Sequence, residues 1–285
     1  MNVKIITDSA CDLPQNIIEQ YNIDVLPIVV FMNDKEYKDS VDIQPKELMT
    51  YMREGGMTKT AQVTYENIDK MLRQYVSDGI PCIYIAFSSE LSGTYQTAKL
   101  VEQDIKDEFP DYDLTVIDSK SASLGFGLMV YLIAELAEKG ASKDELIEKI
   151  NYYKQHIEHI FTVENLEYLY RGGRVSKTAA VVGSVLNIKP ILHVDDGKLI
   201  PIERARGRKK SLSRMIDIIG ERSDSSISDQ VIGISHGDDL KAALWVKEKI
   251  EATYGAKEFI IRDVGCAIGA HSGPGTLAIF FIGKA

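Results

Sequence analysis

The sequence has few cysteines and lacks a long apolar run. Its three cysteines in 285 residues are Cys11, Cys82 and Cys266, and this wide spacing disfavours both a disulfide framework and a clustered metal site. No window approaches the apolar length of a membrane span. The N-terminus, MNVKIITDSA, has a strand pattern without the apolar core of a signal peptide. We therefore expect a cytoplasmic protein with no stable membrane insertion.

Common cofactor and metal motifs are also missing. The sequence contains neither a Gly-x-x-x-x-Gly-Lys-Ser/Thr phosphate loop nor a Gly-x-Gly-x-x-Gly that follows a strand. The five histidines lie in unlike contexts, and no cysteine or nearby acid completes a zinc set. We therefore expect neither a cofactor nor a metal ion.

Acidic residues outnumber basic ones, 42 to 33, but the positive charge is concentrated in one segment. The net charge of −9 argues against nucleic acid as a partner. Between Arg171 and Arg214, however, 11 Lys or Arg stand against 3 Asp or Glu. A basic segment on an acidic protein indicates one anionic partner or ligand group at a particular place.

The first half alternates short apolar runs with amphipathic segments. The expected strands are Val3–Thr7, Val25–Met32 (interrupted by Pro27), Cys82–Phe87 and Leu114–Ile117, and the expected helices are Tyr65–Ser77, one that opens at Ser92-Gly93-Thr94, Gly127–Glu138 and Lys143–His156. This order predicts a mostly parallel sheet with helices on both faces, and therefore an α/β fold. The loops that follow its strands should share one edge, where ligands bind in such sheets.

The second half has a different pattern. Strands are expected at Phe161-Thr162, Lys189–Val194, Lys198–Arg206, Gln230–Ser235, Lys257–Asp263 and Leu277–Ile282, with helices at Lys209–Ile219 and Asp238–Tyr254. Asp195-Asp196-Gly197 is a hairpin turn signal. We therefore predict two unlike domains, a parallel-sheet α/β domain at residues 1–155 and an α+β domain at 156–285.

Three loop-like segments could bind an anion. Ser88–Thr94 follows a strand and opens a helix, whose first N–H groups favour negative charge; plain helix capping by Ser92 is the alternative. Thr60 and Gln62 lie in a predicted loop that could simply be solvated. In Gly269–Thr276, His271 could donate to an anion or act as an acid or base, unless the segment is only a rigid turn.

A fourth feature is the stretch Phe161–Arg174, in which Gly172-Gly173 is a helix stop between two arginines. Arg171 and Arg174 start the basic segment. Arg204, Arg206 and Arg208 alternate along or just beyond a strand, so they should share one face. The four arginines at 171, 174, 204 and 206 are our candidates for a surface that faces a partner or a phosphate, and a solvated charged face is the alternative.

Taken together, these motifs resemble the DegV family. Thr7-Asp8-Ser9 with Asp12-Leu13-Pro14, Leu91–Tyr95, Leu166–Arg174 and Gly269–Thr276 occur in the family's order, and the resemblance covers about residues 3–283. It implies two unlike α/β domains with a long-chain fatty acid, such as palmitate, held between them. It also implies that Thr60 and Ser92 bind the carboxylate, and we add Gly93, Gln62, His271 and Ser272 to that expected site.

The resemblance further implies a carrier without catalysis of its own. Members present the fatty acid to a separate fatty-acid kinase of the dihydroxyacetone-kinase-like type, which makes acyl-phosphate for phospholipid synthesis. We expect a monomer. The alternative is a small-molecule enzyme that acts on a carboxylated or phosphorylated substrate with His271 and Ser92. One departure concerns Ala61 and Val63, which stand where the family usually shows Ser and Pro, and this puts chain-length preference or affinity in doubt.

Overall fold

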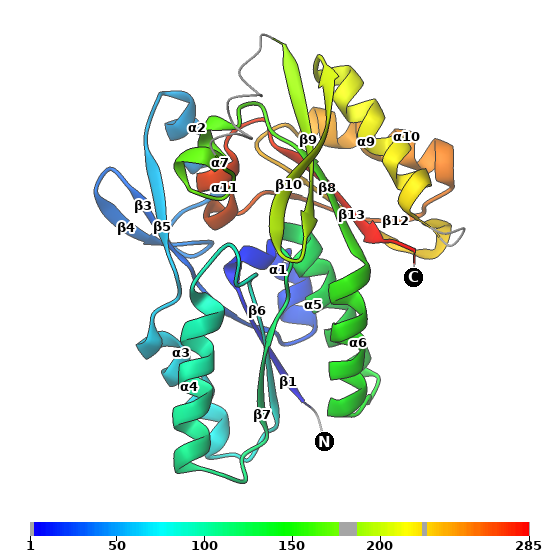
Figure 1. Ribbon diagram of the computed structural model, residues 1–285. Helices are drawn as coiled ribbons and strands as arrows, with labels where there is room; N and C mark the ends of the chain where they lie inside the picture. Colours follow the sequence, from blue (N-terminus) through cyan, green and yellow to red (C-terminus); the bar gives the residue numbers. More distant parts are fainter. Residues whose placement is uncertain (1–2, 177–186, 224–226, 285) are drawn as a thin grey trace.

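The computed structural model describes residues 3–176, 187–223 and 227–284, and these form three sheets (Figure 1). The strands are β1 (Lys4–Asp8), β2 (Asp24–Leu26), β3 (Val29–Met32), β4 (Lys35–Lys38), β5 (Thr58–Ala61), β6 (Cys82–Ala86), β7 (Leu114–Asp118), β8 (Ile157–Thr162), β9 (Ile188–Asp195), β10 (Lys198–Arg206), β11 (Val231–His236), β12 (Glu258–Asp263) and β13 (Leu277–Ile282). The helices are η1 (Ser9–Cys11), α1 (Gln15–Gln20), α2 (Pro45–Arg53), α3 (Tyr65–Val76), α4 (Thr94–Glu108), α5 (Ser123–Glu138), α6 (Lys143–His156), α7 (Glu167–Arg171), α9 (Arg208–Arg222), η2 (Ile227–Asp229), α10 (Leu240–Tyr254) and α11 (Cys266–Ser272).

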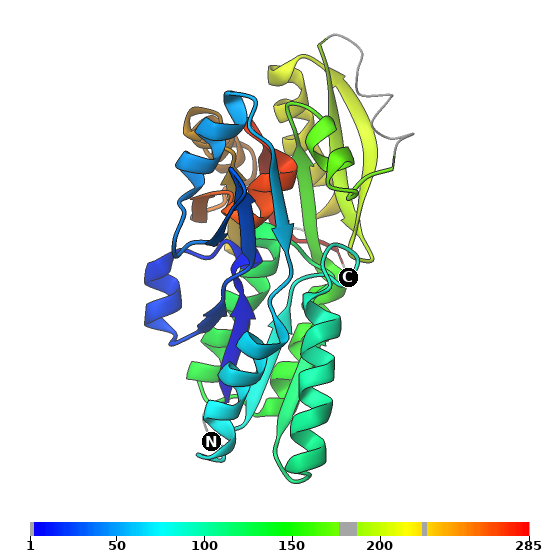
Figure 2. The same ribbon diagram turned by 90° about the vertical axis from the view of Figure 1, so that its left-hand side faces the viewer.

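The predicted parallel sheet is confirmed. Its order is β2-β1-β6-β7, and every neighbouring pair is parallel. Strands β1 and β6 are buried along their whole length, as expected of a sheet covered on both faces. Helices α3 and α4 lie on one side of it and α5 and α6 on the other (Figures 1 and 2). At the start of α6, Ser142 and Glu145 form a reciprocal capping box.

The second sheet is mixed and has the order β10-β9-β8-β13-β11-β12. Only β11 and β12 pair in parallel, and this agrees with the expected α+β pattern. Its first strand along the chain, β8, begins at Ile157. The predicted hairpin turn at Asp195-Asp196-Gly197 joins β9 to β10. The apolar core is continuous between the two sheets, since one cluster contains both Ile83 and Phe280.

A small antiparallel sheet, β4-β3-β5, was not anticipated. The apolar run Val25–Met32 divides at Pro27 and Ile28 into β2, which joins the parallel sheet, and β3, which joins the small one. Residues Thr58–Ala61 form strand β5, so the prediction of a loop there was wrong. Helix α11 packs on β3 and β5 of this small sheet and lies between it and the six-stranded sheet (Figure 1).

Candidate functional site

The edge of the parallel sheet is held together by buried carboxylates. Asp8 accepts the backbone N–H of Phe87 at 2.8 Å, and Asp118 accepts that of Ser89 at 3.1 Å. The loops that follow β1, β6 and β7 therefore meet at one edge, as predicted for parallel strands. Helix α4 starts at this edge, directly after Gly93.

A cavity of about 370 Å³ opens between this edge, α11 and the six-stranded sheet. Its walls are mainly apolar. The apolar lining residues are Ile28, Ala61, Phe87, Leu91, Ala122, Phe161, Leu169, Val194, Leu199, Val264, Ala267, Ile268, Ala278 and Phe280. Its volume and mainly apolar walls are typical of a site for a small, largely apolar ligand.

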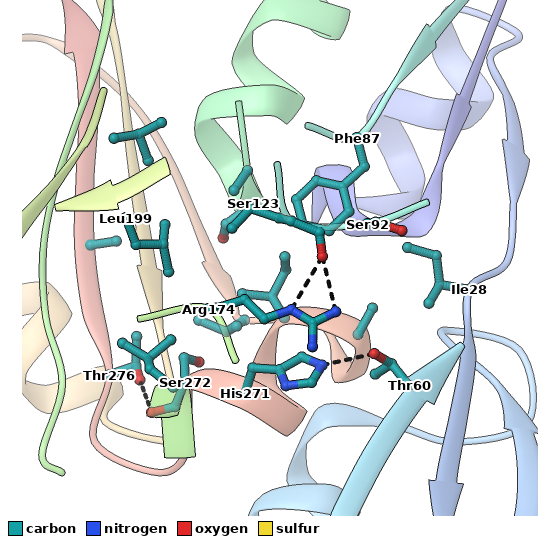
Figure 3. A pocket seen from close by; sticks show the side chains of 18 of the residues that line it. Ile28, Thr60, Phe87, Ser92, Ser123, Arg174, Leu199, His271, Ser272 and Thr276 are labelled. Carbon is teal, nitrogen blue, oxygen red and sulfur yellow. Dashed lines mark hydrogen bonds between the residues drawn. The ribbon is translucent and has the colours of Figure 1, made fainter. Parts of the chain in front are cut away.

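A histidine and a threonine meet in the wall of this cavity. Thr60 Oγ1 lies 2.7 Å from His271 Nε2, and Figure 3 shows the pair at one side of the cavity. Burial and the nearby charge of Arg174 lower the pKa of His271 to about 4, so its imidazole is neutral at pH 7. If the ring proton is on Nε2, it donates to Thr60, and the Thr60 hydroxyl hydrogen is then free to donate to an anion.

Gly172 makes room for this histidine. A Cβ added there would overlap the imidazole of His271. The predicted helix stop at Gly172-Gly173 is therefore also a place of close approach. Helix α11 ends at Ser272, so the segment Gly269–Thr276, for which a rigid turn was the alternative, begins as a helix and turns only at Gly273, which has a φ of +76°.

Ser92 and Gly93 also line the cavity, and Gln62 lies beside them. Ser92 Oγ accepts the N–H of Thr94 at 3.2 Å, although the residue at the N-cap position of α4 is Gly93. A Cβ at Gly93 would overlap the Gln62 carboxamide, which donates to Thr97 Oγ1 at 2.5 Å. Glycine is therefore needed here for packing. Ser92 both stabilises the start of the helix and faces the cavity.

Arg174 is the cation of the cavity. It was expected beside Arg171 on a surface, but its half-buried side chain lines the cavity. Its Nε and Nη2 donate to the carbonyl oxygen of Leu91 at 3.2 and 2.9 Å (Figure 3). Burial lowers its pKa, and no acidic side chain in the described part of the chain forms an ion pair with it. The guanidinium therefore contributes a positive charge that a bound anion could balance.

Next to the cavity is a second hollow of about 260 Å³, which we call the vestibule. It shares Thr60, His271 and Arg174 with the cavity, and Lys59 and Arg171 also line it. Arg171 is exposed and pairs with Glu167 at 2.8 Å. The polar end of the cavity therefore opens towards a basic surface.

The other two predicted arginines lie elsewhere. Arg204 and Arg206 are exposed on β10, where they pair with Pro190 and Ile188 of β9. Neither residue lines the cavity or the vestibule. Arg208, which was expected to share their face, instead pairs with Asp239 at 2.8 Å.

Ser272 is buried in the cavity wall, and its Oγ has no hydrogen-bond partner among the described residues. Three further polar residues of the wall, Ser123, His159 and Ser235, were not singled out from the sequence. Ser235 could have been noticed, because Gly233–Gly237 has the spacing Gly-x-Ser-x-Gly.

In the structure, however, Ser235 lies within β11, paired with Arg262 and Ala278, and not on a strand-to-helix turn. Its Oγ is 3.2 Å from Ser123 Oγ, which donates to Asp12 at 2.5 Å. This arrangement lacks the exposed serine of a nucleophile elbow.

Comparison with known proteins gives the family. The model described as "Uncharacterised protein, DegV family" matches residues 2–284. The chain belongs to the DegV family. A DegV domain-containing protein of Clostridium perfringens is 39% identical over 282 residues, which are 98% of this chain and 97% of that protein.

Solved DegV structures agree with the fold. The structure of a DegV family protein from Thermus thermophilus, described as fatty-acid-binding, superimposes with a TM-score of 0.89 at 29% identity. The match covers 100% of both chains. The Streptococcus pneumoniae fatty acid kinase B3 protein, loaded with linoleic acid, has a TM-score of 0.86 at 24% identity and also covers 100% of both chains. These likenesses confirm the predicted fold of two unlike parts, a parallel sheet with helices and a second, sheet-rich part.

No group of three or more His, Cys, Asp or Glu within residues 3–176, 187–223 and 227–284 is placed to hold a metal ion. No helix in the same ranges is long and apolar enough to cross a membrane.

Proposed function

We propose that this protein binds a long-chain fatty acid such as palmitate in the cavity, with its carboxylate at Thr60, Ser92, His271 and Arg174. The observation that carries the proposal is an apolar cavity with polar donors at one end and, beside them, an arginine that has no acidic partner among the described residues. A relative of the same fold that is described as fatty-acid-binding supports a fatty acid as the ligand.

The chemistry of the two ends matches the two parts of a fatty acid. Burial of the alkyl chain contributes about 0.8 kcal/mol for each methylene group. The carboxylate loses its hydration, and this cost must be offset by hydrogen bonds and an opposite charge. Hydroxyl groups of Thr60 and Ser92 can donate to it, and Arg174 supplies the charge.

We further propose that the carboxylate is presented to a separate fatty-acid kinase through the vestibule. Thr60, His271 and Arg174 border both hollows, so a carboxylate held there lies at the boundary with the basic surface around Lys59 and Arg171. The name of the Streptococcus pneumoniae neighbour associates one protein of this fold with such a kinase. In this account the protein works in the cytoplasm as a monomeric carrier.

The alternative is an enzyme that uses Ser92 and His271. In such an enzyme a base lies within hydrogen-bond reach of the nucleophile. Here Ser92 Oγ is bonded to Thr94, and His271 is bonded to Thr60. These partners favour a binding role for both residues.

The binding proposal is tested with a matched pair of ligands. Delipidated protein is titrated with palmitate and with methyl palmitate, which has the same alkyl chain but no charge. We expect palmitate to bind at least about tenfold more tightly, because charge-assisted hydrogen bonds contribute roughly 1.5–3 kcal/mol. Equal affinities would show that the polar end does not recognise a carboxylate, and no binding of either ligand would overturn the proposed function.

The kinase proposal is tested by charge reversal. Arg171→Glu should leave palmitate affinity unchanged and should impair acyl-phosphate formation by a fatty-acid kinase of the dihydroxyacetone-kinase-like type. Arg204→Glu, on β10 away from the vestibule, is the comparison. An equal loss of acyl-phosphate formation in this variant would mean that the docking surface includes β10. Unchanged acyl-phosphate formation would mean that the kinase docks at the vestibule alone. Unchanged phosphorylation in both variants would contradict docking through these arginines.

A further inference from the structure

Helix α11 carries two polar residues of the cavity wall, His271 and Ser272, but has little intrinsic stability. It has seven residues, which is fewer than two full turns, and such short helices are unstable alone. Its N-cap residue is Gly265, which has no side chain to accept the free N–H groups of the first turn. Its position must therefore be fixed by partners from elsewhere in the chain.

Two buried carboxylates from the first 40 residues supply those partners. Asp39 accepts the N–H of Cys266 at 2.9 Å on one oxygen and that of Ala267 at 3.1 Å on the other. Asp12 accepts the N–H of Gly265 at 3.0 Å. Asp39 is 1% exposed and lies 227 positions from Cys266 in the sequence.

We propose that Asp39 is a positioning residue for His271. Its carboxylate accepts the N–H groups of Cys266 and Ala267 at the start of α11. These bonds fix the rotation of the helix about its axis and its position along that axis, and so keep the imidazole next to Thr60. The inference rests on the proposed function only in the role that it gives His271 at the carboxylate.

The geometry links the two residues over a single helical turn. Ala267, which donates to Asp39, precedes His271 by four residues, and residues four apart lie one turn apart on the same side of a helix. If the first turn frays, about half of α11 is lost, and only the C-terminal turn, capped by the N–H of Gly273, is left. His271 would then leave the position in which Thr60 Oγ1 lies 2.7 Å from its Nε2.

The surroundings of Asp39 suit a fixed anchor. The hydroxyl groups of Ser9 and Ser40 also donate to its carboxylate, and it interacts electrostatically with the buried carboxyl groups of Asp8 and Asp12. Within the described ranges no lysine or arginine forms an ion pair with it. Burial therefore raises its pKa, and the hydrogen bonds from α11 and from the two serines oppose that rise.

The test follows the imidazole of His271 by NMR titration of the full-length, ligand-free protein, with His271→Gln to assign its signal. In the unmodified protein His271 should titrate near its lowered pKa of about 4. In Asp39→Ala the midpoint should move towards the ordinary value of 6.5, because the ring leaves its buried place. Palmitate affinity should fall about tenfold, as expected when a helix cap is lost.

Two further variants keep the test decisive. Asp39→Asn retains one acceptor oxygen, so it should fold if Asp39→Ala does not and should give an intermediate shift. Glu102→Gln is the matched control: Glu102 is also buried and accepts a backbone N–H, from Val116 at 3.1 Å, but lies on α4 away from α11. Its His271 signal should be unchanged.

Folded Asp39 variants in which His271 titrates as in the unmodified protein would overturn the proposal. An equal shift in Glu102→Gln would do the same, because it would show a general loosening. The titration needs no ligand, so it separates failure of this inference from failure of fatty acid binding.

Discussion

Thr60 Oγ1 and His271 Nε2 lie 2.7 Å apart although the two residues are separated by 211 positions in the sequence. The contact joins strand β5 of the small sheet to helix α11. It exists only when both elements are in place, and it lies where the apolar cavity meets the basic vestibule.

Removal of the Thr60 hydroxyl should weaken fatty acid binding. Thr60→Val keeps the shape of the side chain but removes one donor to the carboxylate, so palmitate affinity measured by calorimetry should fall roughly tenfold. Thr58→Val is the control, since Thr58 lies on the same strand and donates to Ala270 O at 2.9 Å but does not line the cavity. Equal losses in the two variants would mean that Thr60 acts only through the local structure.

Gly172→Ala should disturb the site by crowding. The backbone of Gly172 is ordinary for any residue, with a φ of −71°, so alanine adds no strain there. Its Cβ would overlap His271, and we expect overpacking of about 1–3 kcal/mol to appear as a loss of palmitate affinity. A variant that binds palmitate as well as the unmodified protein would show that the imidazole can move without consequence.

Arg174 and Arg171 should differ in effect although both are arginines of the basic segment. Arg174→Met removes the positive charge of the cavity and should weaken palmitate binding by at least tenfold, the cost expected for a charged hydrogen bond. Arg171→Met removes an exposed residue whose ion pair with Glu167 contributes little. Titration of both variants with palmitate should separate them, and the reverse order of affinities would contradict the assignment of Arg174 to the carboxylate.

The stability of the ligand-free protein should depend on pH through His271. Its pKa is lowered to about 4 in the folded protein, so the unfolded chain takes up a proton first as the pH falls below 6.5. Protonation of His271 therefore does not lower the free energy of unfolding above pH 6.5, and it lowers this free energy progressively as the pH falls from 6.5 towards 4. Between pH 7 and pH 5 the unmodified protein should lose about 2 kcal/mol more than His271→Gln in urea unfolding.

Asp8 and Asp12 act in the opposite direction. Burial raises the pKa of these residues to about 7 and about 8, so they stabilise the fold at low pH and less as the pH rises through those values. They are present in both proteins, so their effect cancels in the comparison. Parallel pH profiles for the unmodified protein and His271→Gln would rule out a lowered pKa at His271.

Regular elements of the fold could be predicted from the sequence because their patterns are local. The apolar runs Val3–Thr7 and Cys82–Phe87 predicted β1 and β6, and the alternation with helices predicted their parallel order. The helix expected at Lys143–His156 has the same bounds in the structure, as α6.

The missed elements depend on contacts between distant segments. Thr58–Ala61 has no apolar run, and it becomes a strand because β3 supplies the hydrogen bonds. Helix α11 is short and has a glycine at its N-cap, and Asp39 and Asp12 hold its first turn. Arg174 could not be separated from Arg171 by sequence, because Gly172-Gly173 redirects the chain between them.

The most direct test of the central claim is extraction of the purified protein with organic solvent, followed by mass spectrometry of the extract. The account predicts about one C14–C18 fatty acid for each protein molecule, replaced by palmitate after delipidation and reloading. Protein that is purified empty and stays empty after incubation with palmitate would contradict it.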